Sequence, residues 1–523
     1  MAVIFLLPLI MGFCTFAAES DWGLAGGDYL LPPAYGPEND WYDDLYEEEF
    51  DPGNFDHIVD NPFRRAEEYP LSTFSIDVDT AGYSITRRHI EGNRLPPKSA
   101  IRIEELINYF DYDYAPPDDG KPFAVHPEVG IAPWNPEHLL ARIALKGKEF
   151  PAEERPKVNL VFLIDVSGSM SPPNRLPLVK SSLKLLVEEL NGSDRIAICV
   201  YAGAAGTVLQ PTSCDNKSAI ITAINKLNSG GSTAGGAGIQ LAYNLAQENF
   251  DPLAVNRVIL CTDGDFNVGI TNRGDLIDLI EAKAKTGVYL TILGFGLDNF
   301  QDGTLKQLSS KGNGNYGYID TIEEAKKILV KQLSGTLVTI AQDVKIQVEF
   351  NPATVGAYRL IGYENRVMRD EEFNDDDVDA GDIGAGHTVT AFYQLIPAGH
   401  PDLDALPKRD PLKYGPPPVE ADPTYPDELL TTKIRYKLPQ HSESELISFS
   451  VMADSVRQAG EESPDFRFAA AVAGFGMLLR DSPYKGNAAY PGIISLAQGA
   501  IGQDEWNYRT DFVAMVTKAG TLK

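Results

Sequence analysis

The sequence is poor in cysteine, which excludes the common cysteine-based frameworks. Only four cysteines occur in 523 residues, at positions 14, 199, 214 and 261. No two of them have the CxxC spacing of a structural zinc site, and the three outside the N-terminal apolar run cannot all pair with one another. Cys199 and Cys261 stand inside apolar, strand-like runs, so we expect buried free thiols rather than disulfides.

Basic residues are scarce relative to acidic ones. The chain has 45 lysines and arginines against 74 aspartates and glutamates, a formal net charge of -29 at pH 7. Nucleic-acid binding needs a basic surface that neutralises phosphates, and no such cluster is visible, so we exclude a nucleic-acid partner. An acidic balance fits a soluble exported protein or one that attracts cations, and does not choose between them.

Two signatures of enzymes are also missing. The chain has no G-x-x-x-x-G-K-[ST] loop, which argues against a nucleotide ligand. It has no G-x-S-x-G elbow, and none of its seven histidines falls in the three oxygen-rich segments described below. A serine there would lack a base and an orienting acid, so we expect no enzymatic activity.

The N-terminal segment 1–18 is an apolar run followed by small residues, which is typical of a secretory signal. We therefore expect an exported protein, located in the periplasm, on the cell surface or outside the cell. Cys14 is a candidate lipidation site, although the bulky Phe13 departs from a lipobox; membrane attachment is expected only through such an N-terminal anchor. Residues 19–65 are acidic and rich in Pro and Gly, which predicts a flexible linker.

Residues 157–336 predict an α/β fold. Near-continuous apolar runs such as VNLVFLID alternate with segments of helical periodicity. This pattern indicates a doubly wound, mostly parallel, Rossmann-like sheet that is covered by helices on both faces.

The regions on either side of 157–336 are different. Residues 66–156 contain helices and alternating β-strands, and residues 337–455 contain more β-strands around a Pro/Asp-rich insertion at 398–428. We expect the two flanks to build one β-sandwich-like domain together. The C-terminal region 456–523 predicts helices, one of which begins at Ser463-Pro464.

Three segments of the α/β region place oxygen-bearing side chains near the ends of strands. DVSGS supplies Asp165, Ser167 and Ser169, GGSTAGG supplies Thr233, and CTDG supplies Asp263. Because ligands of doubly wound sheets bind at the carboxyl ends of the strands, we expect these five oxygens to converge on one hard cation. Mg²⁺ is the expected cofactor, with Mn²⁺ or Ca²⁺ as alternatives. Two acids and three hydroxyls supply only two formal negative charges, so the ion is not over-neutralised. An uncrowded ion of this kind keeps a water-filled position that a carboxylate from outside can take.

Other acidic motifs have simpler interpretations. Acids and serines after a strand also cap the next helix, and this alternative holds for DVSGS taken alone. In SIDVDT, we expect Asp77 and Asp79 to end a strand and to cap the following helix.

The run FNDDDVDAGDIGAGH invites a calcium interpretation. Asp375, Asp377 and Asp379 have EF-hand-like spacing, but Ala380 and Gly386 stand where a glycine and a glutamate are needed. We expect a solvated acidic turn.

The three oxygen-rich segments, DVSGSM, GGSTAGG and CTDGDFN, resemble the metal-ion-dependent adhesion site (MIDAS) of von Willebrand factor type A (vWA) domains. The resemblance covers residues 157–336. In that family the two serines and the threonine contact the ion directly or in a switchable way, and the acids act partly through water. The resemblance implies these roles, position by position, for Ser167, Ser169, Thr233, Asp165 and Asp263.

The flanks resemble the bacterial exported YfbK-like proteins, from about residue 66 to the end. The similarity lies in segments such as LPPKSAIRIEELINYFDYDY and DFRFAAAVAGFGMLLRDSPY. In those proteins a vWA domain is embedded between an N-terminal and a C-terminal region. That family has no settled biochemical role, so the resemblance implies architecture and not activity.

The sequence as a whole predicts a divalent-cation-dependent protein-binding module of the adhesion or scaffold type. Its metal would coordinate an acidic residue of a protein partner. Two alternatives remain open: a structural component of an envelope assembly with a purely structural metal, and an accessory subunit of an ATPase or chelatase complex. An intracellular location would favour the last of these.

Overall fold

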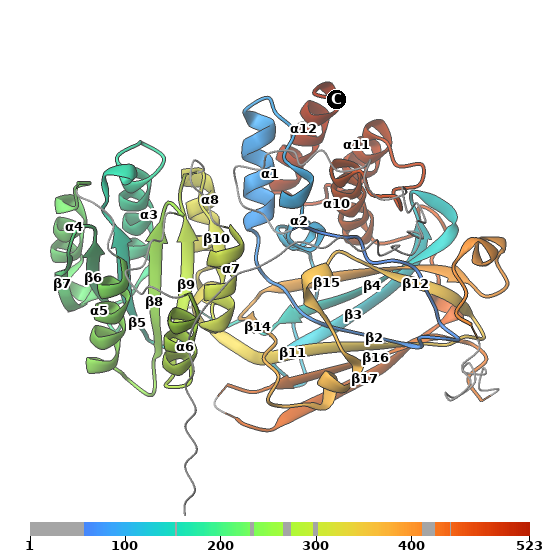
Figure 1. Ribbon diagram of the computed structural model, residues 1–523, viewed down its shortest axis with the longest axis horizontal. Helices are drawn as coiled ribbons and strands as arrows, with labels where there is room; N and C mark the ends of the chain where they lie inside the picture. The colour runs from blue at the N-terminus through green and yellow to red at the C-terminus, as the bar shows by residue number, and fades with distance from the viewer. Residues whose placement is uncertain are drawn as a thin grey trace, which may run out of the picture. The chain divides into compact units, whose positions relative to one another are not determined.

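The computed structural model describes residues 57–151, 154–230, 235–264, 273–296, 302–410, 424–439 and 441–523. They form three β-sheets with helices around them (Figure 1). One sheet comes from the middle of the chain, and the other two come from the segments on either side of it. No helix among these residues is long and apolar enough to cross a membrane.

Some predicted segments fall outside the described residues. These are the signal segment 1–18 with Cys14, the linker up to residue 56, and residues 411–423 of the insertion.

The central sheet has six strands in the order β10-β9-β8-β5-β6-β7. The strands are β5 (Val158–Asp165), β6 (Arg195–Tyr201), β7 (Ala205–Ser213), β8 (Val255–Thr262), β9 (Val288–Gly294) and β10 (Tyr316–Tyr318). All neighbours are parallel except β6 and β7. Every residue of β5 is buried, which explains why its sequence shows no polar alternation. The predicted mostly parallel sheet is confirmed.

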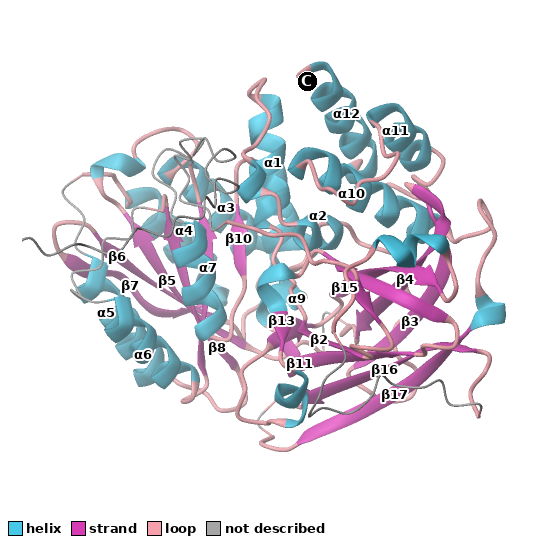
Figure 2. Ribbon diagram, turned by 45° about the vertical axis from the view of Figure 1, so that its right-hand side comes forward, coloured by secondary structure: helices cyan, strands magenta, loops and turns pink. Residues whose placement is uncertain are grey.

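Helices cover both faces of this sheet (Figure 2). They are α3 (Leu176–Glu189), α4 (Lys217–Lys226), α5 (Gly235–Glu248), α6 (Arg273–Ala284), α7 (Asp302–Lys311) and α8 (Ile322–Lys326), followed by the π-helical turn Lys327–Lys331 and α9 (Leu333–Leu337). Leu160, Phe162 and Ile164 of β5 share a core with α3 and α4. Val161 and Leu163 share another with α5, α6 and α7. The alternation of side chains along a strand thus builds one core on each face.

The other two sheets form a sandwich. Their orders are β1-β12-β15-β4-β3 and β13-β2-β11-β16-β17, with β14 beside β11. The strands are β1 (Arg64–Arg65), β2 (Leu71–Ser75), β3 (Phe123–Ala132), β4 (Asn135–Gly147), β11 (Thr339–Phe350), β12 (Val355–Ile361), β13 (Val367–Met368), β14 (Gly381–Gly384), β15 (Thr388–Pro397), β16 (Glu428–Lys437) and β17 (Ser444–Met452). Strands from before and after the central region pair directly, β4 with β15 and β2 with β11. Phe350 of one sheet stacks on Tyr358 of the other at 3.8 Å between ring centroids, so the predicted sandwich of both flanks is confirmed.

Helices from both flanks form a separate hydrophobic core with the β1-β12-β15-β4-β3 sheet. They are α1 (Ala81–Glu91), α2 (Ile103–Asn108), α10 (Pro464–Arg480), α11 (Tyr490–Gln498) and α12 (Tyr508–Thr521). α10 begins as predicted: the Ser463 hydroxyl accepts a hydrogen bond from Phe466 N at 3.2 Å, and Pro464 occupies the first turn.

A buried ionic cluster joins the central region to the flanks. Lys306 of α7 donates hydrogen bonds to Asp77 Oδ2, at 2.7 Å, and to Glu105. Its ammonium group lies 3.8 Å from Asp79 Oδ2. Arg366, from the C-terminal flank, donates to Asp77 Oδ2 at 3.0 Å. One lysine of the central region is therefore held by acids of the N-terminal flank, and one of those acids is shared with the C-terminal flank.

The prediction that Asp77 and Asp79 cap the next helix is wrong. The N-cap of α1 is Thr80, and its side chain makes no capping hydrogen bond. Asp79 Oδ1 instead accepts a hydrogen bond from Tyr316 N of β10 at 2.8 Å. The SIDVDT segment serves the contact between regions because its acids meet a buried cation from α7.

A second polar contact lies next to α8. Arg87 of α1 donates to Asp320 Oδ2 at 3.2 Å and to Glu324 Oε2 at 2.9 Å. Tyr109 OH donates to the same Glu324 oxygen at 2.9 Å. The central region is thus fastened to the N-terminal flank at two places.

Removing the buried cation should weaken this junction. We expect Lys306→Met to lower the free energy of unfolding by about 3 kcal/mol, because it leaves buried carboxylates short of a partner. Lys311→Met is the matched control on the same helix: Lys311 lies nearer the surface and pairs with Glu281 and Asp379, so a loss within about 1 kcal/mol is expected. Urea unfolding measures both, and equal losses would contradict the assigned role of Lys306.

The same cluster predicts a pH dependence. Burial raises the pKa of Asp79 to about 7, and the negative charges of Asp77 and Glu105 add to the rise. The positive charges of Lys306 and Arg366 act in the opposite direction and lower this pKa. The unfolded chain releases this proton at lower pH, so folding loses stability as the pH rises through this window.

Asp79→Asn cannot ionise and keeps an oxygen for Tyr316 N. We expect its stability relative to the wild type to improve from pH 5 to about pH 7 and to level off above it in thermal melts. A difference that does not change with pH would show that Asp79 is not the titrating group.

Candidate metal centre

The loop after β5 brings three of the predicted ligands together. Ser167 N donates a hydrogen bond to Asp165 Oδ1 at 2.8 Å, and the hydroxyl oxygens of Ser167 and Ser169 are 2.9 Å apart. Asp165 and Ser167 are buried, and Ser169 is half-buried. The alternating positions of the motif therefore do place their oxygens in one group.

One oxygen of this group has no partner. Asp165 Oδ2 is buried and accepts no hydrogen bond within the described part of the chain. Burial raises the pKa of Asp165 to about 6, and the nearby charge of Asp263 adds to the rise. A buried carboxylate oxygen without a partner is costly, and a cation beside it would remove that cost. The residues present therefore fit a hard divalent cation.

Asp263, which follows β8, lies beside the same loop. Arg175, at the beginning of α3, connects the two: its Nη1 donates to Asp263 Oδ2 and to the carbonyl oxygen of Ser169, both at 2.7 Å. The Arg175 and Asp263 side chains are only 6% and 1% exposed. The structure thus brings four of the five predicted ligands to the same loop region, with Asp263 joined to the others through Arg175.

The fifth predicted ligand, Thr233, lies outside the described residues, as do its neighbours 231–234. The metal-ligand roles of all five residues stay predictions.

Arg175 is a site residue that the sequence pattern did not reveal. It is the first basic residue after DVSGS, but a basic residue at the start of a helix is ordinarily solvated. Only the fold shows that its side chain turns back under the loop.

Two other groups of potential ligands exist among the described residues. In each, the ligand atoms lie within 4.8 Å of one another: one is Asp77, Asp79 and Glu105, and the other is His138, His400 and Asp402. Lys306 already occupies the first group. Among the described residues, the acids of the EF-hand-like run form no such group, and Lys437 donates to the carbonyl oxygen of Asp376 there at 2.6 Å.

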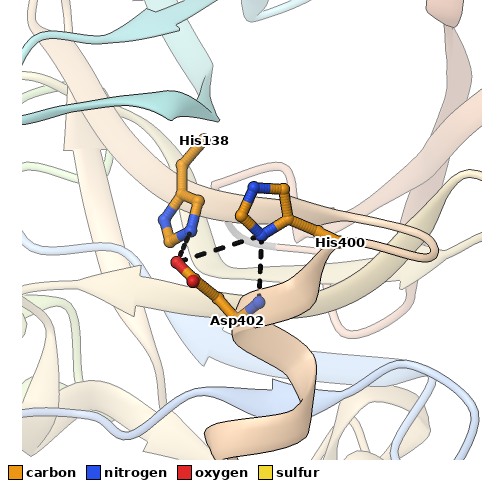
Figure 3. A group of neighbouring side chains, drawn as sticks. All are labelled: His138, His400 and Asp402. Atoms are coloured by element: carbon orange, nitrogen blue, oxygen red, sulfur yellow. Dashed lines mark hydrogen bonds and ion pairs between the residues drawn. The ribbon is translucent and has the colours of Figure 1, made fainter.

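The histidine group is shown in Figure 3, where Asp402 points at His138 and His400 lies beside them. His138 Nε2 and Asp402 Oδ2 are 2.9 Å apart. His138 Nδ1 faces Gln394 Nε2 at 2.9 Å, and the Gln394 oxygen accepts from Trp134 Nε1 at 3.1 Å. Since an indole can only donate, Gln394 must turn its amide donor toward His138. His138 Nδ1 is therefore an acceptor, and the ring proton sits on Nε2, directed at Asp402.

This arrangement disfavours a metal at His138. A metal-bound histidine normally donates its second ring N–H to an acceptor, whereas Gln394 offers a donor there. The group is better described as a neutral histidine that holds the 3₁₀ turn Pro401–Ala405 through Asp402.

Family models match three stretches of the chain. The von Willebrand factor type A domain matches residues 159–332, and the C-terminal part of the uncharacterized protein YfbK matches residues 335–522. A model described as von Willebrand factor matches residues 49–142.

Curated relatives follow the same pattern. The uncharacterized protein YfbK of Escherichia coli K12 is 42% identical over 472 residues, which are 89% of this chain and 80% of the relative. The uncharacterized protein sll0103 of Synechocystis is 29% identical over 184 residues, 35% of this chain and 43% of the relative. The human inter-alpha-trypsin inhibitor heavy chain H2 is 28% identical over 181 residues, 32% of this chain and 19% of the relative.

Solved structures also match. A von Willebrand factor type A protein from Catenulispora acidiphila has a TM-score of 0.42 and 16% identity, covering 78% of this chain and 91% of its own. The ArnB paralog VWA2 from Sulfolobus acidocaldarius has a TM-score of 0.35 and 13% identity, covering 76% and 98%.

The proton on His138 Nε2 determines how the histidine group should respond to zinc. The wild type should keep a proton on His138 Nε2 in the presence of Zn²⁺, as read from ¹⁵N-histidine NMR spectra. Gln394→Glu replaces the amide donor with an acceptor and still accepts from Trp134, so its His138 can bind metal through Nε2. We expect Zn²⁺ affinity to rise at least about tenfold in this variant. Zinc coordination by His138 in the wild type would overturn the assignment.

Proposed function

The chain belongs to the family of YfbK and carries a von Willebrand factor type A domain, and we propose that this domain is a divalent-cation-dependent protein-binding module. Domains of this type commonly mediate interactions between proteins. In this proposal the domain binds its partner through a metal ion, which coordinates an acidic side chain of that partner. The residues that hold the ion are Asp165, Ser167, Ser169, Thr233 and Asp263.

The single observation that carries the proposal is the unpaired oxygen of Asp165. Asp165 Oδ2 is buried and accepts no well-formed hydrogen bond in the described residues, although the Tyr201 hydroxyl lies near this carboxyl group. Asp165 belongs to a loop whose two serine hydroxyls already touch. Ser167 N already satisfies Asp165 Oδ1, as a backbone cap would, but this bond leaves the buried Oδ2 without a donor of its own. A cation beside Asp165 Oδ2 would satisfy the oxygen that this backbone bond leaves unpaired.

The chemistry of the residues supports a small, hard cation. Carboxylate and hydroxyl oxygens are the ligands that Mg²⁺ prefers, and Mn²⁺ or Ca²⁺ can replace it. The bound ion would supply a Lewis-acidic position for a carboxylate from outside. Asp165 and Asp263 contribute two negative charges, and the serines contribute neutral donors, so the site does not over-neutralise a dication.

We also propose that the module works outside the cytoplasm. The support is the signal-like segment at 1–18, followed by an acidic, Pro- and Gly-rich stretch.

Metal removal tests the proposal. We expect the melting temperature of the mature protein to rise with Mg²⁺ and to fall in EDTA, because a ligand that binds only the folded state adds about 2.7 kcal/mol at a hundred times its Kd. The rise should vanish in Asp165→Ala and in the double variant Ser167→Ala/Ser169→Ala. Ser181→Ala, an exposed serine on α3 away from the loop, should keep it. A wild type that does not respond to millimolar Mg²⁺, Mn²⁺ or Ca²⁺ would refute the metal-dependent function.

A further inference from the structure

Arg175 is a buried cation inside a site that is built to hold another cation. Its Nη1 lies 2.7 Å from Asp263 Oδ2, and the same nitrogen holds the carbonyl oxygen of Ser169. Buried carboxylates near a metal site commonly serve the metal, so an arginine that already neutralises one of them demands a physical explanation.

The position of Arg175 is enforced by the fold. It precedes α3, whose first turn is anchored when Val179 N donates to Arg175 O at 2.9 Å. On the other side it lies against Gly296, after β9: a Cβ at Gly296 would stand 2.4 Å from Arg175 Nε. Gly296 has φ +80°, a conformation that glycine adopts without strain. Arg175 is thus packed between loops that follow β5, β8 and β9, and it cannot simply swing into solvent.

The charges of the site define what this arginine does. Asp165 and Asp263 are the acids of the proposed centre, and Arg175 compensates Asp263. With Arg175 the described residues offer a divalent ion one net negative charge, and without it they would offer two. The fixed positive charge of Arg175 weakens the attraction between the site and a divalent ion. This effect is large because charges interact strongly in the low-dielectric interior of a protein.

We infer that Arg175 is a built-in counter-cation of the metal site, which weakens the hold on the divalent ion and leaves that ion a positive charge for an incoming carboxylate. Arg175 keeps Asp263 paired when no ion is bound, so the folded protein does not carry two uncompensated buried acids. When a divalent ion is bound, the positive charge of Arg175 prevents the protein from fully neutralising the charge of the ion. This inference rests on the proposed metal-dependent function and adds a residue that sets its strength.

A merely structural role makes the opposite prediction. If Arg175 only positioned Asp263 and the Ser169 carbonyl, its removal would disorder the site and weaken metal binding. The direction of the change therefore separates the two explanations.

The test measures Mn²⁺ binding to the full mature chain by electron paramagnetic resonance. We expect Arg175→Met, which has a similar volume and no charge, to bind Mn²⁺ at least about tenfold more tightly than the wild type. Arg175→Lys restores the charge and should stay within about threefold of the wild type. Arg175→Gln is a second neutral variant in case the methionine variant does not fold, as judged by circular dichroism.

The chain offers a matched control at the other end of the same sheet. Arg155 pairs with Asp194 at 2.6 Å, and the two side chains are 5% and 0% exposed. Asp194 Oδ1 accepts from Val158 N, at the beginning of β5 and away from the metal loop. Arg155→Met removes the same charge from a similar buried pair, so its stability should drop while its Mn²⁺ affinity stays that of the wild type.

A second readout uses acetate as a carboxylate probe. Acetate should displace water from protein-bound Mn²⁺, seen by water proton relaxation, at a lower concentration in the wild type than in Arg175→Met.

The outcomes are distinguishable. A wild type that binds no Mn²⁺ refutes the proposed function, and this inference with it. A wild type that binds Mn²⁺ beside an Arg175→Met variant that binds it equally or more weakly overturns the inference alone. An equal response to acetate in both proteins overturns the claim about residual charge.

Discussion

The architecture depends on a buried lysine. The central α/β region is inserted between two flanks that must find each other to complete a sandwich, and Lys306 reaches from that region into acids of the N-terminal flank. Arg366 from the C-terminal flank shares Asp77 with it. Because unpaired buried charges are so costly, such a cluster is satisfied only when all three segments are in place, which favours one relative placement over looser ones. Hydrophobic contacts alone are less directional.

At the proposed metal site, in contrast, the buried acids are not all compensated by cations of the protein. In the Lys306 cluster, cations compensate the acids throughout. At the carboxyl end of β5, only Asp263 has its arginine, and Asp165 keeps a buried oxygen without a partner. Proteins keep an unsatisfied buried oxygen where function needs it, and the stability of the surrounding fold must offset its free-energy cost. The loop follows β5, whose residues are all buried, and helices cover both faces of the sheet behind it.

The His138 group shows why the types of ligand do not by themselves define a metal site. Two histidines and an aspartate would suit zinc by composition. The deciding atom is the amide nitrogen of Gln394, whose orientation is set by Trp134 and which in turn places the proton of His138. The oxygen site has no such conflict, because serine hydroxyls rotate and carboxylates only accept. The hydrogen-bonding groups around each cluster thus distinguish the structural contact between His138 and Asp402 from the proposed metal site.

The sequence by itself determined the class of the central fold, since VNLVFLID and the other apolar runs that alternate with helical segments are typical of strands covered on both faces. It also determined which oxygens gather after β5, because Asp165, Ser167 and Ser169 are neighbours along the chain and their spacing is local. It indicated a sandwich from both flanks, although not its pairing. Only the tertiary structure decided the partners of Asp77 and Asp79, the fold-back of Arg175 and the tautomer of His138. Each of these depends on a residue that is distant in sequence, Lys306, Asp263 or Gln394, and a long-range electrostatic partner leaves no periodicity or spacing in the sequence from which it could be foreseen.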